Sequence, residues 1–141
     1  MTDFPFPISL SQWQPLRKAP HPPFVDFMLF AKANFPCIRT GIVDPYANDF
    51  HHAVKGRSRN NNSCDLVGVV LNHDLHLYEL HGMMFGGDLE AYGEHYELPL
   101  QAIIRSYWTA YAEHLGIEGT FRSLDEWAQA ILNVGRRAKA A

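Results

Sequence analysis

Histidine and carboxylate side chains are concentrated in the run NHDLHLYELHG at residues 72–82. Imidazole and carboxylate groups bind zinc and related cations, and they transfer protons near neutral pH. If the run is a strand, alternation places His73, Glu79 and His81 on one face and His76 on the other. Glu79 and His81 would then lie roughly 6 to 7 Å apart along that face, and they could share a cation. If the run is helical, His73 and His76 share a face instead.

Two further histidines, His51 and His52, follow Asp49 in a segment that reads as weakly helical, residues 46–54. Adjacent residues on a helix point about 100° apart, so one ring could face inward and the other outward. These histidines can join the later run only if the fold brings residue 50 close to residue 80. Spacing alone does not decide this.

The histidines therefore allow two interpretations. In the favoured one they are hydrogen-bonded groups on a hairpin, and the protein binds no cofactor. In the alternative, a divalent metal such as zinc is held by Glu79 and His81 with one of His73, His51 or His52. Such a metal would activate water, and the protein would be a metal-dependent hydrolase or nuclease.

Charge is segregated along the chain. No Lys or Arg occurs from Asn60 through Ile104, yet this stretch holds seven acidic residues and four histidines. Acidic surfaces steer basic partners and imitate phosphate, so we favour a non-catalytic protein-binding role of the inhibitor or immunity type. The expected contact residues are acidic or apolar, with the apolar ones beside a flexible glycine pair. They are Asp88, Glu90, Glu94, Met83, Met84 and Phe85.

A short basic loop, KGRSRNNNS at residues 55–63, carries Lys55, Arg57 and Arg59 beside three asparagines. Cations and amide donors suit a phosphate backbone. The whole chain, however, has a net charge of −3 and a pI near 6.2. Because nucleic-acid-binding domains usually present a broad basic face, a nucleic-acid partner is not the expectation.

No nucleophilic residue is supported by its setting, so we assign no catalytic residue. Cys37 follows Pro36 in an apolar stretch and is expected in the core, whereas Cys64 precedes Asp65, whose charge disfavours a thiolate. The serines lack the G-x-S-x-G setting. The leading interpretation is therefore not an enzyme.

The elements that must position these groups form an α+β fold. The apolar run LVGVVL at 66–71 predicts a strand, and the turn residues after it predict a hairpin at about 65–81. A further strand is expected at 37–43. Prolines, glycines, a capping box at Ser123 and Glu126, and helical spacing of apolar residues predict three main helices. These span about 24–35, 100–115 and 123–138.

Length and composition indicate one domain over residues 1–141, with a proline-rich N-terminal arm at 1–23. No apolar run approaches the roughly 20 residues of a membrane helix, and the first residues do not resemble a secretory signal. We therefore expect no membrane partner and a cytoplasmic location, where the two cysteines stay reduced. Only 19% of residues are charged while 13% are aromatic, which leaves a homo-oligomer open.

Overall fold

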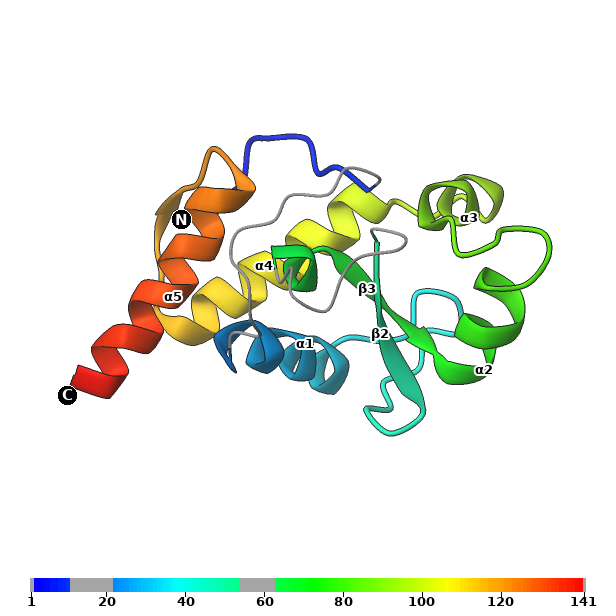
Figure 1. Cartoon of the computed structure of the whole chain (residues 1–141), viewed down its shortest axis with the longest axis horizontal. Coiled ribbons are helices and arrows are strands. Elements are labelled where there is room, and N and C mark those ends of the chain that lie inside the picture. The colour runs from blue at the N-terminus through cyan, green and yellow to red at the C-terminus, as the bar shows by residue number, and fades with distance from the viewer. Residues whose placement is uncertain (1, 11–21, 54–62, 141) are drawn as a thin grey trace.

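The computed structural model describes residues 2–10, 22–53 and 63–140, and it has a mixed α+β architecture (Figure 1). The helices are α1 (Pro22–Asn34), α2 (His73–Leu75), α3 (Leu89–His95), α4 (Leu100–Leu115) and α5 (Leu124–Ala140). A 3-10 turn, η1 (Ser63–Leu66), and a π-helical turn, η2 (His76–Leu80), complete the helical part. The strands are β1 (Thr2–Asp3), β2 (Asn48–His52), β3 (Gly68–Asn72) and β4 (Gly119–Thr120). The predicted α+β class is confirmed.

The three long helices lie close to the predicted ranges because strong local signals fix their ends. Gly116 adopts a left-handed conformation, φ 72°, and its N–H bonds back into the last turn of α4. Before α5, the Glu126 N–H donates to Ser123 Oγ at 3.2 Å, and the Arg122 N–H donates to Glu126 Oε2 at 2.6 Å. Side chains thus satisfy backbone groups at this helix end, as in a capping box.

An aromatic core joins α1, α4 and α5 at one end of the molecule. Trp108 and Trp127 are fully buried there, and the Phe4 ring packs edge-on against them at 5.2 and 4.9 Å. Phe4 directly follows β1, which pairs in parallel with β4, and residues 11–21 of the predicted N-terminal arm lie outside the described residues. Figure 1 shows α5 at the left of this core, whereas β2, α2 and α3 extend to the right.

The sheet that matters for the site is the antiparallel pair β2–β3. Its register places Asn48 opposite Asn72 and His51 opposite Val69. The first arm of the predicted hairpin is confirmed by β3, but its partner is β2, from a segment predicted to be weakly helical. That segment has little β propensity of its own, so tertiary pairing with the apolar strand β3 decides its conformation.

The predicted second arm of the hairpin is wrong, because residues 73–80 are helical. Asn72 causes the change of direction: its side chain accepts hydrogen bonds from the N–H groups of Asp74 and Leu75. An Asn at this position caps a helix and satisfies donors that would otherwise have no partner. The long side chains that follow favour the helix over a strand.

The strand predicted at 37–43 is also absent; the segment is a turn anchored on Cys37. The Gly41 N–H donates to the Cys37 carbonyl, and Gly41 has φ 73°, which glycine adopts without steric cost. A single backbone bond, from Ile38 N–H to Val70 O at 3.0 Å, connects this segment to β3. Within the described parts of the chain, no helix is long and apolar enough to span a bilayer.

Candidate metal centre

Three imidazole rings meet beside the β2–β3 sheet. His51 comes from β2, His76 begins η2, and His81 follows it. His76 Nε2 lies 2.9 Å from His51 Nδ1 and 3.1 Å from His81 Nε2. One nitrogen from each ring lies within 4.8 Å of the others, the arrangement needed to hold one metal ion. Residue 50 is thus brought close to residue 80.

Two local features bring the rings together. The β2–β3 register places His51 opposite Val69, near the strand that leads to the other two histidines. The Asn72 cap then turns the chain from β3 into α2. The His81 N–H donates to the His76 carbonyl at 3.1 Å, a five-residue step typical of a π-helix. In a regular α-helix, residues five apart point about 140° from each other. The wider π turn instead leaves the two ring centres 4.8 Å apart.

Asp49 orients the central histidine. Its Oδ2 lies 3.0 Å from His76 Nδ1 and 2.7 Å from His73 Nδ1. Burial raises the pKa of the Asp49 carboxyl, but hydrogen bonds from the two histidines outweigh it and hold the pKa below its usual value. When His76 donates from Nδ1 to Asp49, the lone pair of its Nε2 is directed at the other two rings. Carboxylate–histidine pairs orient metal ligands in this way.

His51 is the buried member of the cluster, only 7% exposed. Burial, reinforced by the neighbouring histidines, lowers the pKa of His51 to about 3. The ring is therefore neutral at physiological pH, the state in which imidazole binds metals. Its Nε2 is buried with no hydrogen-bond partner in the described structure.

The geometry and chemistry of these donors fit a cation better than a proton network. Two ring nitrogens, from His51 and His81, point at the one lone pair of His76 Nε2. One lone pair does not serve two donors well, whereas a cation between the rings accepts all three lone pairs. Zn–N bonds of 2.0–2.1 Å at the tetrahedral angle separate nitrogens by about 3.3 Å, close to the separations from His76 Nε2.

The structure places the metal ligands proposed from sequence in different settings. His81 lies in the cluster, while His73 is exposed and contacts Asp49. Glu79 Oε1 accepts hydrogen bonds from Arg39 Nε at 2.8 Å and Tyr92 Oη at 2.5 Å. The bond from Arg39 is the main reason that the pKa of Glu79 is lowered. Glu79 is therefore engaged away from the three rings.

Of the paired histidines in β2, only His51 joins the cluster. His52 points to the opposite face of the strand, where its Nε2 lies 2.7 Å from Oδ1 of the buried Asp65. The ring of Phe50 lies edge-on to His52 at 5.7 Å on that face. Period-two alternation explains the separation, but only once the segment is known to be a strand.

Gly87 supports His81 from the other side. Its N–H donates to the Leu80 carbonyl at 2.8 Å, so the loop after η2 folds back over the cluster. A Cβ at position 87 would lie 2.9 Å from ring atoms of His81, and Gly87 has φ +86°. Both facts restrict this position to glycine.

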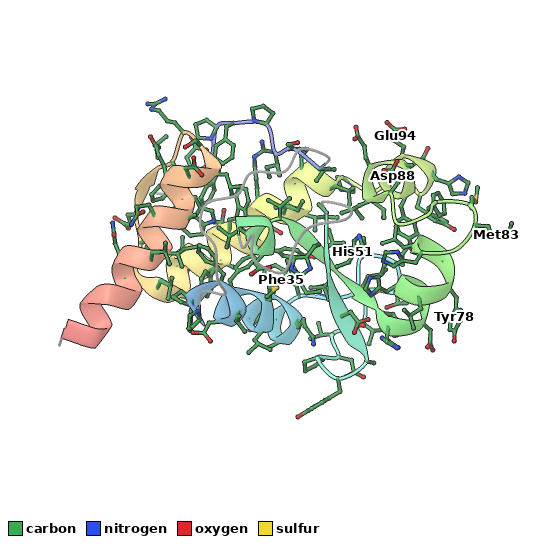
Figure 2. All side chains as sticks on the ribbon, in the orientation of Figure 1. Phe35, His51, Tyr78, Met83, Asp88 and Glu94 are labelled. Atoms are coloured by element: carbon green, nitrogen blue, oxygen red, sulfur yellow. The ribbon has the colours of Figure 1, made fainter. Side chains whose placement is uncertain are left out.

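The proposed partner-binding residues lie at the same end of the molecule, but they differ in exposure. Met83 and Met84 are exposed, whereas Phe85 packs edge-on against Tyr92 at 5.1 Å. Figure 2 shows Tyr78, Met83, Asp88 and Glu94 at this end, with His51 nearer the middle. Asp88 caps α3 by accepting from the Ala91 N–H, and the carboxylates of Glu90 and Glu94 are exposed.

The basic loop with Lys55, Arg57 and Arg59 lies outside the described residues. Cys37 is buried, as expected, and its Sγ accepts from the N–H groups of Arg39, Thr40 and Asn72. Cys64 lies in η1.

Sequence reasoning did not identify His76 as a ligand or Asp49 as its orienting group. The available signal was the alternation of Asp49 and His51 in a possible strand, followed by a capping Asn72. Comparisons of the chain with protein-family models, curated proteins and solved structures find no match. The chemistry of the site must therefore be argued from its geometry.

Proposed function

We propose that this protein is a metal-dependent hydrolase of the nuclease type. The observation that carries the proposal is the convergence of three ring nitrogens, from His51, His76 and His81, within 4.8 Å. Neutral imidazoles favour borderline cations such as Zn²⁺ or Ni²⁺. When bound, such a cation acts as a Lewis acid and makes water a nucleophile near neutral pH.

The number of ligands supports a catalytic over a structural role. Structural zinc sites are usually closed by four protein ligands, whereas catalytic sites use three and leave one position open. Among the described residues, no fourth His, Cys, Asp or Glu joins the three histidines. The exposed side chain of His81 places one side of the site toward solvent.

The surrounding residues would hold the site ready for this chemistry. His51 contributes a buried ring that stays neutral, and Asp49 fixes the tautomer and direction of His76. The Arg39–Glu79 ion pair neutralises the carboxylate nearest in sequence to His81. The donor set therefore stays all-nitrogen, so no carboxylate ligand would offset the positive charge that a bound divalent cation offers to an anionic substrate.

Phosphodiesters are the substrate class that we propose. The connection between β2 and β3 carries Lys55, Arg57 and Arg59, cations suited to a phosphate backbone. A net charge of −3 does not oppose this role, because a bound divalent cation changes the local charge at the site. This reading replaces the inhibitor role as the leading function, and a nucleic acid becomes the proposed substrate.

The test is cleavage of plasmid DNA and of a structured RNA by chelator-treated protein with added Zn²⁺, Mn²⁺, Ni²⁺ or Mg²⁺. Cleavage should require an added metal and should be lost in His51→Ala and His81→Ala. The matched control is His114→Gln, because His114 is an exposed histidine on α4 outside the cluster. Metal binding without cleavage of either polymer would reject the nuclease and leave the metal site standing.

A second function, binding of a basic protein partner, is favoured by a groove on α3 that does not involve the three histidines.

A further inference from the structure

A shallow groove of about 510 Å³ lies between α3 and the start of α4. Its floor is apolar, with Leu98, Leu100 and Ala102 contributed by the α3–α4 connection and the first turn of α4. Leu10 of the N-terminal arm lines it as well. The volume falls within the range of ligand sites, roughly 300 to 1,000 Å³.

Three carboxylates line this groove, two on α3 and one just after it. Glu90 and Glu94 lie four residues apart on one face of α3, Glu97 follows the end of the helix, and all three are exposed. Within the described residues none of them forms an ion pair with Lys, Arg or His. In the sequence around Glu90, Glu94 and Glu97, Lys and Arg are absent from Asn60 through Ile104.

Glu90 and Glu94 repel each other, because like charges four residues apart on a helix are unfavourable. Glu94 also lies in the last turn of α3, where an acidic residue opposes the helix dipole, and Glu97 follows two residues after the helix ends. A ligand with positive charge would relieve this repulsion.

The carboxylates do not converge on a metal ion. Among the described residues, only His51, His76 and His81 bring three ligand atoms within 4.8 Å of one another. A row of separate charges beside an apolar floor instead matches a ligand with several cations and an apolar face. Such an arrangement combines electrostatic steering with apolar burial.

We propose that this groove binds a cationic amphipathic segment of a protein partner. Basic side chains of the partner lie along Glu90, Glu94 and Glu97, and its apolar side chains cover Leu98, Leu100 and Ala102. This contact requires no metal and does not depend on the hydrolase function. It extends the acidic partner surface proposed from sequence to Glu97 and the α4 floor.

The test uses fluorescence anisotropy with a labelled amphipathic helical peptide of Leu and Lys and a matched peptide of Leu and Glu. Chelator-treated protein should bind the first peptide and not the second. Binding should weaken at least tenfold in Glu90→Gln/Glu94→Gln/Glu97→Gln. The control Asp26→Asn/Glu113→Gln/Glu118→Gln makes the same change in net charge at exposed positions away from the groove, and its affinity should stay within twofold. Equal loss in both triple variants would overturn the proposal, because net charge alone would then explain binding.

Two single variants test the apolar floor separately from the carboxylates. They also distinguish a loss of peptide binding from a loss of folding. Ala102→Lys places a cation on the exposed floor at a helix position that tolerates Lys, and it should abolish peptide binding. Glu97 has φ 54°, a conformation that favours glycine. Glu97→Gly should therefore keep or raise the melting temperature, while its affinity for the peptide falls three- to fivefold. Unchanged peptide affinity in either variant would contradict the proposed site. Displacement of the peptide by spermine, added at the same concentration of positive charge as the peptide, would also contradict it, because spermine has no side chains to cover the apolar floor.

Discussion

The histidine cluster and the α3 groove are two polar regions at one end of the molecule, and they differ in how their groups are satisfied. At the cluster, three imidazole rings converge, one ring is buried, and Asp49 fixes the orientation of another. At the groove, three exposed carboxylates lie along α3 and just after it, without ion-pair partners in the described structure. Convergent, oriented donors suit a single ion, whereas dispersed like charges beside an apolar floor suit a macromolecule. The two regions should therefore respond to different variants.

The largest expected effect is the loss of metal-dependent stabilisation in His81→Ala. A ligand at one hundred times its dissociation constant stabilises the folded state by about 2.7 kcal/mol. For a domain of this size that corresponds to a rise in Tm of roughly 5 to 10 °C. Differential scanning fluorimetry with Zn²⁺ should show this rise in the wild type and in His114→Gln, but not in His81→Ala. Because His81 is exposed, the variant should fold, and a retained shift would remove it from the ligand set.

Asp49→Asn should weaken metal affinity by about 10- to 100-fold, because it removes the carboxylate that orients His76. His73→Gln is the comparison, since His73 contacts the same carboxylate from the solvent side. It should change affinity by less than threefold. Competition with a chromophoric chelator measures the metal affinity of both variants. An equal loss of affinity in Asp49→Asn and His73→Gln would contradict a specific orienting role for Asp49.

Gly87→Ala should lower metal affinity about five- to tenfold and leave peptide binding at the groove unchanged. The added Cβ would lie 2.9 Å from the His81 ring, and alanine at φ +86° is itself strained. Measuring both ligands on one sample sharpens the contrast between the regions. A parallel loss of both would show that the loop supports the whole end of the molecule.

Cys37→Ala should lower the free energy of unfolding by about 1–3 kcal/mol, because buried backbone N–H groups lose their acceptor. One of those groups belongs to Asn72, whose side chain caps the helix that leads to His76. Denaturant titration measures the loss, and Cys37→Ser should recover part of it.

The Cys37 contribution should also depend on pH. Burial raises the pKa of the thiol, but the hydrogen bonds from Thr40, Asn72 and Arg39 bring it below its usual value in the folded protein. A lowered folded-state pKa stabilises above the unfolded-state pKa, and this gain is lost as pH falls through the folded value. The stability difference between wild type and Cys37→Ala should therefore widen as pH rises from neutral toward 9. A constant difference would contradict the direction of the shift.

The parts of the fold that sequence predicted are those set by local signals. The long helices have prolines, glycines or a capping box at their ends, and β3 is a short apolar run. The segment Asn48–His52 has no such signal and becomes a strand only by pairing with β3. At 73–80, the turn signal of Asn72 was recognised, but it begins a helix instead of reversing a strand.

The site was predictable only in part for the same reason. The run at 72–82 contains His76 and His81, but the grouping of the three rings depends on contacts between distant residues. Arg39 lies forty positions from Glu79 and occupies its carboxylate, while β2 brings in His51. Neither contact is encoded in the local spacing. The charge pattern, by contrast, is a property of sequence, and the role of Glu90 and Glu94 in partner binding stays a prediction.

Calorimetric titration of chelator-treated protein with Zn²⁺ tests the central claim most directly. The account predicts one ion per chain in the wild type and no specific binding in His51→Ala, with circular dichroism showing that the variant remains folded. No binding by the folded wild type, or the same stoichiometry and affinity in His51→Ala, would contradict a cation site built from these three histidines.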